Sequence, residues 1–169
     1  QGFSKKSGKA YAMMTLEDLL GTYQVLVMND NFDKFKHLLS TDQALMIIGE
    51  ANNDEDRPKF FPQEIMPLGD APKRFTEQIC LRVDSAHLDD QKLQQALNIA
   101  EANRGRCPLF LRIRTAAGEH VYIEANERYH VAPSNELQHA FDDLLGHDAY
   151  YAKVDQKLPE RERPAWARK

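Results

Sequence analysis

The chain has 169 residues, of which 42% are hydrophobic and 28% charged, and its formal net charge is −4. This length suits one large domain or two small ones, and the apolar content excludes wholesale disorder. No apolar run reaches the roughly 18 residues of a membrane span, so a transmembrane protein is also excluded. The only two cysteines, Cys80 and Cys107, favour a reducing compartment, the cytoplasm, over a disulfide framework.

Residues 1–70 show the pattern of short strands around one helix. Alternation with a period of two indicates strands, and phenylalanines and leucines at helical spacing indicate the helix. Pro62 interrupts the last strand and predicts that this strand lies at an edge of its sheet. The chain has no initiator methionine and begins in what looks like the end of a strand, which indicates a fragment. The expected strands cover 10–16, 23–28, 44–49 and 59–66, and the expected helix covers 30–39.

With one further strand before residue 1, the order becomes β-β-β-α-β-β, the order of the OB-fold. That fold is a Greek-key barrel which binds oligonucleotides through strands 2–3 and through its first and fourth loops. The first seventy residues are therefore expected to form an OB-fold that lacks its first strand.

Residues 71–146 predict a second unit, a small β-α-β-β-α domain, after a Gly- and Pro-containing linker over 68–73. Helix N-caps are expected at Asp89 and Ser134, and glycines that end these helices at Gly105 and Gly146. Residues 147–169 are expected to be a flexible tail. The expected strands cover 77–83, 109–115 and 120–125. Leu93 of the helix after Asp89 and Val121 and Ile123 of the last strand are expected to face the core.

The run of residues 7–21, SGKAYAMMTLEDLLG, resembles the OB-fold segment of the bacterial replicative DNA polymerase III alpha subunit. The family pattern there is approximately K-x-G-K-x-M-A-F-x-T-L-E-D-x-T-G, followed by a strand and then F-x-x-x-x-x-K-x-x-x-L-L. The resemblance continues in the same order along nearly the whole chain. Its further segments are NFDKFKHLL (31–39), LMIIG (45–49), IMPL (65–68), CPLFLRIR (107–114), ERYHV (127–131) and residues 133–145.

This resemblance implies a role in DNA replication. In that family the OB-fold binds single-stranded DNA, and the last domain docks onto the tau subunit of the clamp-loader complex, among other replisome subunits. The polymerase active site lies upstream of this region in the family, so the fragment itself is assigned no nucleotidyl transfer. The sequence departs from the pattern at Met13, where the family has an aromatic residue, and at Leu20, where it has threonine.

The candidate DNA-binding residues fall into three groups. Lysines of the first OB loop suit phosphate contacts, outward residues of strands 2–3 suit base contacts, and residues at the fourth loop suit a clamp from the other side. An RNA-binding OB module of the anticodon-binding type and a protein-interaction module without nucleic-acid binding remain alternatives. The three groups are Lys5, Lys6 and Lys9; Tyr11, Met13 and Gln24; and Arg57, Lys59 and Phe60.

The candidate partner-binding residues lie in the second unit and the tail. Arg82, Arg112 and Arg114 share one face of neighbouring strands, and the tail carries Trp166. Ion pairs across the strands with Glu119 or Glu124 are the structural alternative for these arginines.

The sequence predicts no catalytic site, no metal site and no cofactor. The acidic residues 54–56 lack the glycine and glutamate spacing of an EF-hand, so a solvated loop is the better interpretation. The six histidines show no zinc-ligand spacing with the two cysteines, and no phosphate-binding glycine motif occurs.

Overall fold

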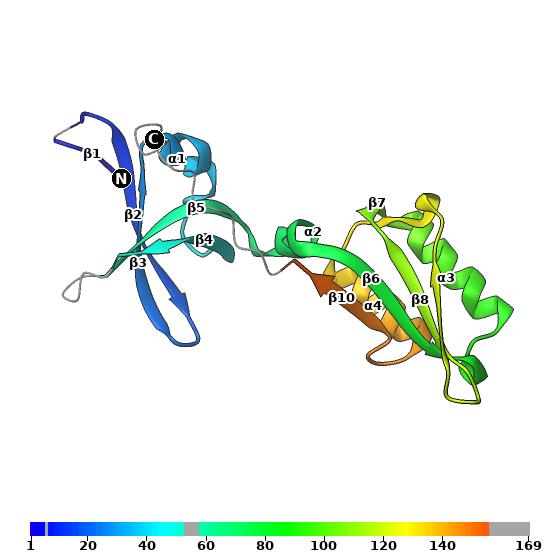
Figure 1. Ribbon diagram of the computed structural model, residues 1–169. Coiled ribbons are helices and arrows are strands. Elements are labelled where there is room, and N and C mark those ends of the chain that lie inside the picture. The colour runs from blue at the N-terminus through cyan, green and yellow to red at the C-terminus, as the bar shows by residue number, and fades with distance from the viewer. Residues whose placement is uncertain (6, 53–57, 156–169) are drawn as a thin grey trace, which may run out of the picture. The chain divides into compact units, whose positions relative to one another are not determined.

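The structure is a computed structural model that describes residues 1–5, 7–52 and 58–155 (Figure 1). The described chain forms two compact units, residues 1–68 and residues 69–155, and is of mixed α+β composition. Each unit has one sheet, and no pairing among the described strands closes either sheet into a barrel. None of the described helices has the length and apolar character to cross a membrane.

The first unit is a five-stranded sheet in the order β1-β2-β3-β5-β4. The ladders are antiparallel except that between β3 and β5, and β1 contributes only two residues, paired with the start of β2. A short helix and a 3-10 turn follow β3 at the position expected for one longer helix. The elements are β1 (Gly2–Phe3), β2 (Ala10–Asp18), β3 (Gly21–Met28), α1 (Asp30–Phe35), a 3-10 helix (Lys36–Leu38), β4 (Leu45–Ala51) and β5 (Lys59–Pro67).

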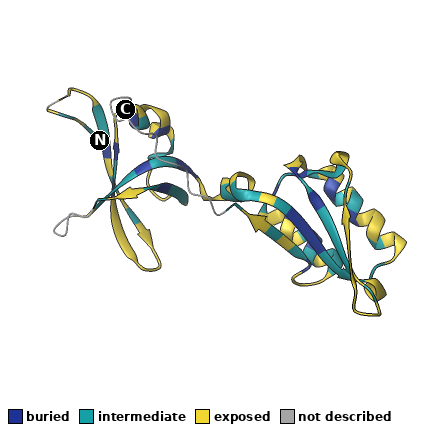
Figure 2. Ribbon diagram, in the orientation of Figure 1, coloured by how far each residue is buried: buried dark blue, intermediate teal, exposed yellow. Residues whose placement is uncertain are grey.

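The core of the first unit lies between the sheet and α1. Ala12, Val25 and Val27 are almost fully buried on the core face of β2 and β3, and they pack with Phe32 and Phe35 of α1. Because successive strand residues point to opposite faces, Met13 and Gln24 are exposed on the other side. Figure 2 shows buried and exposed stretches along the strands of this unit. The alternation read from the sequence therefore sorts most residues of these strands to the correct face.

The predicted edge position of the strand with Pro62 is wrong, because β5 lies between β3 and β4. A proline without an N–H is tolerated there since β3 pairs only with Lys59 and Phe60, and the β4 register shifts between Ile48 and Gly49, opposite Pro62. A Cβ at Gly49 would lie 2.1 Å from the Phe61 carbonyl oxygen, so this approach of the two backbones requires glycine.

The second unit is a four-stranded sheet in the order β10-β6-β8-β9, in which only β6 and β8 are parallel. Helices α3 and α4 cover one face of the sheet and enclose a core that contains the fully buried Ile79, Leu137 and Phe141 (Figure 1). The elements are α2 (Ala71–Phe75), β6 (Thr76–Asp84), α3 (Asp90–Ala102), β7 (Arg104–Cys107), β8 (Leu109–Arg114), β9 (His120–Glu124), α4 (Asn135–Leu145) and β10 (Tyr150–Val154), with 3-10 helices at 68–70, 85–87 and 127–129.

Both predicted N-caps are confirmed. The Asp89 side chain accepts a hydrogen bond from the Lys92 N–H at 2.7 Å, and the Ser134 hydroxyl accepts one from the Leu137 N–H at 3.1 Å. Gly146, with a φ of 106°, ends α4 as expected.

Three expectations for the second unit are wrong. Residues 150–154, assigned to the flexible tail, form β10 because they complete an antiparallel ladder along β6. Gly105 lies in β7 rather than at the helix end. A Cβ at this position would come within 2.4 Å of the Val131 carbonyl oxygen. Leu93, Val121 and Ile123 are 38%, 45% and 46% exposed rather than buried, and for the last two the cause is that β9 is an edge strand.

Candidate nucleic-acid interface

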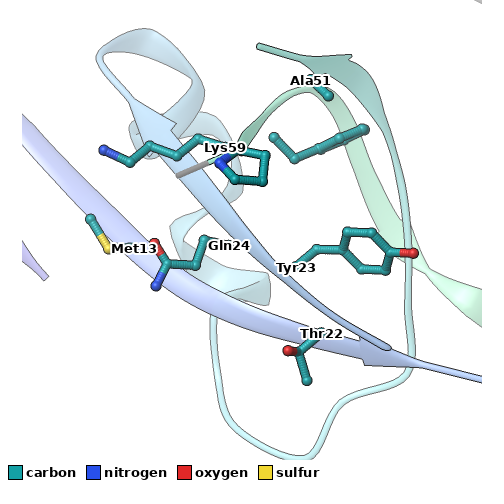
Figure 3. A pocket seen from close by; sticks show the side chains of 8 residues that line it. Met13, Thr22, Tyr23, Gln24, Ala51 and Lys59 are labelled. Carbon is teal, nitrogen blue, oxygen red and sulfur yellow. The ribbon is translucent and has the colours of Figure 1, made fainter. Parts of the chain in front are cut away.

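A groove of about 560 Å³ opens on the first unit where β2, β3 and β5 meet (Figure 3). The strand register explains it: β3 pairs with β5 only at Gln24 and Val25, so residues of β3 before Gln24 extend past β5. The groove therefore lies where the sheet narrows to a two-stranded arm. Its lining residues are Met13, Thr22, Tyr23, Gln24, Ala51, Pro58, Lys59 and Phe60.

Four predicted DNA-binding residues, from three different strands, meet in this groove: Met13, Gln24, Lys59 and Phe60. Gln24 and Lys59 are register partners, and Met13 lies diagonally from Gln24 on the same face, because its own partner is Leu26 (Figure 3). The groove thus presents an apolar side chain, an amide, a cation and an aromatic ring together.

The backbone at Lys59 is held by a reciprocal contact with Asn52. The Lys59 N–H donates to Asn52 Oδ1 at 2.7 Å, and the Asn52 N–H donates to the Lys59 carbonyl at 3.0 Å. This contact fixes the point from which the half-buried Lys59 side chain leaves the sheet. Within the described part of the chain, Lys59 has no ion pair.

Tyr23 lines the groove although it alternates in step with Val25 and Val27, which are buried in the core. Its side chain is 44% exposed because it lies opposite Leu16 on the arm, beyond the last β3–β5 pair. The two-residue turn after β2 was the available signal: it lengthens both strands and moves Tyr23 away from the covered part of the sheet.

The described residues of the first loop, Lys5 and Lys9 among them, do not line this groove. Lys5 is exposed in the turn, and Lys9 Nζ lies 3.6 Å from Asp30 Oδ1, with both side chains largely in solvent. The Tyr11 ring packs over Gly2 of β1, so it is half-buried there. Lys6 and Arg57, together with the acidic residues 54–56, lie outside the described residues.

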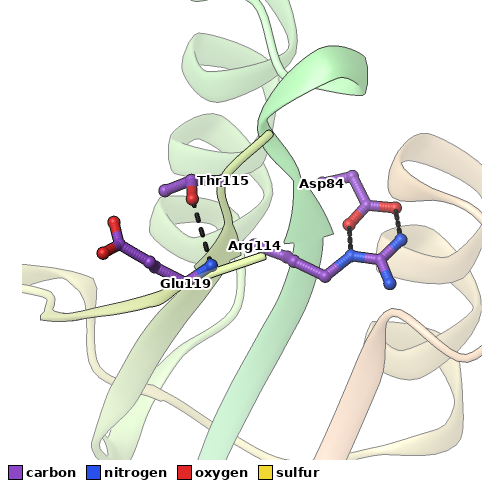
Figure 4. Close-up of polar contacts among 4 residues, drawn as sticks. All are labelled: Asp84, Arg114, Thr115 and Glu119. Atoms are coloured by element: carbon purple, nitrogen blue, oxygen red, sulfur yellow. Dashed lines mark hydrogen bonds and ion pairs between the residues drawn. The ribbon is translucent and has the colours of Figure 1, made fainter. Parts of the chain in front are cut away.

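In the second unit the three arginines have different surroundings. Arg114 makes a two-pronged ion pair with Asp84, at 2.6 Å and 2.9 Å, which lowers the pKa of the Asp84 carboxyl and raises that of the guanidinium (Figure 4). The Glu119 carboxylate points away from Arg114, and Glu119 is joined instead through its N–H to the Thr115 hydroxyl (Figure 4).

Arg82 lies over the Tyr151 ring, 3.7 Å from its centroid, and neither Arg82 nor Arg112 has an ion pair among the described residues. The alternative of cross-strand ion pairs thus holds for Arg114 alone, with Asp84 as the partner. Trp166 lies outside the described residues.

The described residues contain no group of three or more histidine, cysteine or carboxylate side chains that could hold a metal ion. Both cysteines are free and buried, and burial raises the pKa of the Cys107 thiol to about 11. At neutral pH this thiol is protonated, so it is neither a nucleophile nor a ready metal ligand.

No protein-family model matches the chain. In sequence it is similar to proteins named DNA polymerase III subunit alpha: it is 25% identical over 153 residues to that of Escherichia coli O157:H7, which covers 89% of this chain and 13% of the relative. Identity to that of Vibrio cholerae is 25% over 146 residues, or 85% of this chain and 12% of the relative. Identity to that of Saccharopolyspora erythraea is 23% over 145 residues, or 83% and 12%.

The chain spans only about an eighth of the length of these curated relatives. The similarity therefore supports the resemblance found from the motifs and corresponds to a partial region of the alpha subunit.

Proposed function

We propose that this chain is the non-catalytic C-terminal region of a replicative DNA polymerase, and that its first unit holds single-stranded DNA in the groove between β2, β3 and β5. The observation that carries the proposal is the meeting of Met13, Gln24, Lys59 and Phe60 at one site, next to the exposed ring of Tyr23. Similarity to alpha subunits over 83–89% of the chain adds support from an independent source.

We further propose that the first unit is an OB-fold. Support comes from the five strands, from the helix between β3 and β4, and from a groove on strands 2 and 3 that Ala51 and Pro58, on either side of the β4–β5 connection, also line. These are the strands and one of the loops through which OB-folds bind oligonucleotides.

In the proposed complex, charge and stacking act together without reading the sequence. Lys59 contacts a phosphate, and the exposed face of Tyr23 receives a base, a contact worth about 1–3 kcal/mol. Gln24 offers an amide to a base edge or a phosphate, and Met13 packs on the sugar or base but has no π-face. Binding of this kind is tolerant of sequence and steeply dependent on salt.

The second unit is proposed to dock the polymerase onto a replisome protein, with the tau subunit of the clamp loader as the first candidate. This part follows from the resemblance, and the residues proposed for the contact are Arg82, Arg112, Arg114 and Trp166. A role in bacterial replication places the chain in the cytoplasm, a reducing setting in which the two free cysteines remain reduced.

The test is fluorescence anisotropy of labelled oligo-dT and oligo-U at about 50 and 200 mM salt. The wild type is expected to bind oligo-dT with a strong salt dependence. Lys59→Gln should remove one phosphate contact and so lower the slope of log affinity against log salt by about 0.7. Over this fourfold salt range, the affinity of the variant should therefore fall about 2.6-fold less than that of the wild type. Lys36→Gln, on the 3-10 helix of the same unit and outside the groove, is the charge-matched control and should change little.

Stacking is tested by Tyr23→Leu, which keeps an apolar side chain and removes the ring. Its affinity for oligo-dT should fall by about 5- to 150-fold, the equivalent of one lost stacking contact. Phe3→Leu removes an exposed ring of the same unit that lies outside the groove and is the control. Lys5, Lys6 and Lys9 changed together to Ala show whether the first loop takes part.

Preference for oligo-U over oligo-dT would replace the proposal with the RNA-binding alternative. A folded wild type that binds neither oligonucleotide would leave only the protein-interaction role.

A further inference from the structure

The face of the second sheet that α3 and α4 leave uncovered carries one prominent side chain from each strand. Ile79, Leu81 and Leu109 point to the helices and are buried, so their neighbours in sequence point to the other side. We call these four residues the arginine face: Tyr151 of β10, Arg82 of β6, Arg112 of β8 and Tyr122 of β9.

Two like charges stand directly opposite each other on this face. Arg82 and Arg112 are register partners in the parallel β6–β8 ladder, so two cations leave the same face of neighbouring strands. The next partners on the same side of that ladder are Asp84 and Arg114, which form the two-pronged ion pair. Arg114 is thus neutralised by Asp84, whereas Arg82 and Arg112 have no ion pair among the described residues.

The Arg82 side chain contacts the Tyr151 ring, but its Nε has no hydrogen-bond acceptor among the described residues. Its guanidinium stacks on the Tyr151 ring at 3.7 Å, and its Nε is buried with no hydrogen-bond partner. An unpartnered buried donor costs free energy, so Arg82 lies at a position where the fold tolerates an uncompensated cation. The stacking keeps the planar guanidinium oriented, which suits two-pronged binding of a carboxylate.

A groove of about 350 Å³ lies beside this pair. Its lining includes Arg82, Arg112 and Arg114, and its only carboxylates are Asp84 and Asp148. Cations therefore outnumber anions there even when the lining histidines are neutral, and Asp84 is already occupied by Arg114. Tyr122, on the same face, is 64% exposed.

We propose that the arginine face docks an acidic segment of a protein partner, with carboxylates at Arg82 and Arg112 and neighbouring apolar groups on Tyr122 and Tyr151. The inference rests on the docking role proposed for the second unit and specifies the chemistry of what docks. Charge complementarity selects an anionic occupant. Exposed tyrosines beside arginines are the residue types that dominate protein–protein contacts.

The test uses the full chain with a fluorescein-labelled hexaglutamate peptide, and with hexaglutamine and a six-nucleotide oligo-dT as comparison probes. Arg112→Glu is the central variant because it places a carboxylate opposite Arg82. This change should not lower the melting temperature of the second unit, since Arg112 has no ion pair among the described residues to lose. The same change should weaken hexaglutamate binding by tenfold or more, since a charge-assisted contact is replaced by repulsion.

Arg106→Glu makes the same charge change on β7 and is the matched control. The proposal is supported when Arg112→Glu alone loses hexaglutamate without losing stability. Equal losses in both variants would show a general charge effect and overturn it, as would a wild type that treats hexaglutamate and hexaglutamine alike. Tighter binding of oligo-dT than of hexaglutamate at Arg112 would assign the face to nucleic acid instead.

The Lys59→Gln variant separates this inference from the DNA-binding proposal. It alters the groove of the first unit, so it should leave hexaglutamate binding unchanged. A flattened salt dependence of oligo-dT binding in Lys59→Gln, together with hexaglutamate binding that is the same in Arg112→Glu as in the wild type, would retain the DNA groove and reject the arginine face.

Discussion

Replacement of Gly49 by alanine is expected to destabilise the first unit strongly. The added Cβ would lie 2.1 Å from the Phe61 carbonyl oxygen and 2.8 Å from Pro62 Cα. Both atoms belong to the backbone, so no side-chain rotation relieves the overlap, and β4 and β5 have to separate. Overpacking of a well-packed region typically costs about 1–3 kcal/mol, and a clash between the backbones of two paired strands belongs at the upper end of that range.

A loss of about 3 kcal/mol lowers the folded-to-unfolded ratio roughly 150-fold. Hydrogen exchange followed by mass spectrometry, resolved by peptide, is the suitable assay because it reads each unit separately. Amides of β4 and β5 should lose protection in Gly49→Ala, while those of the second unit should not change. Gly69→Ala is the control, because a Cβ at Gly69 meets no atom within 4 Å.

Wild-type protection of β4 and β5 in Gly49→Ala would refute this reasoning, since it would mean that the strands need no glycine at the register shift. Equal losses in both variants would also refute it, because they would reflect a general effect of alanine rather than the close approach of the two backbones.

Three further predictions concern the second unit. Burial raises the pKa of Tyr150 from its ordinary value of 10.0 to about 12, so above pH 10 the unfolded chain loses this proton first and stability falls as pH rises to about 12. Tyr150→Phe should reduce that alkaline loss by ~1 kcal/mol, allowing for the half-exposed ring, in denaturant titrations at pH 8 and 11. Asp89→Ala and Ser134→Ala should each cost about 1 kcal/mol of unfolding free energy, because each removes an N-cap hydrogen bond, whereas Asn135→Ala, one residue past the cap, should not. Phe141→Ala should cost about 3–5 kcal/mol in the same titrations, since the fully buried ring leaves a cavity, and a cost below 1 kcal/mol would contradict its central position in the core.

Local chemistry in the sequence predicted the local structure well. The caps at Asp89 and Ser134 and the alternation that buries Val25 and Val27 depend on neighbours in the chain, so the sequence contains them directly. The position of Pro62 in a central strand depends instead on a register shift in β4 and on where β3 ends. The register shift and the end of the β3–β5 pairing involve residues far apart in sequence, and local propensity rules cannot predict them.

Gly105 illustrates the same limit for glycines. A glycine shortly after a helix is typical of a helix end, but this one is required by the close backbone approach of Val131. Likewise β10 carries no strong strand signal of its own and exists because the exposed side of β6 offers an antiparallel partner.

The candidate groove shows why a site is harder to predict than the fold around it. The β2–β3 ladder runs from the pair Tyr11–Met28 to the pair Asp18–Gly21, but β5 accompanies β3 over only two pairs. Alternate residues of β3 are therefore buried only where β5 and the core cover the strand. On the free arm both faces of the strand meet solvent, so the same alternation does not bury a side chain. Tyr23 lies just beyond the covered part of β3. Although it alternates in step with the buried residues Val25 and Val27, its ring is therefore exposed and lines the groove. The difference in length between these strands creates the site, and residue types alone do not encode that difference.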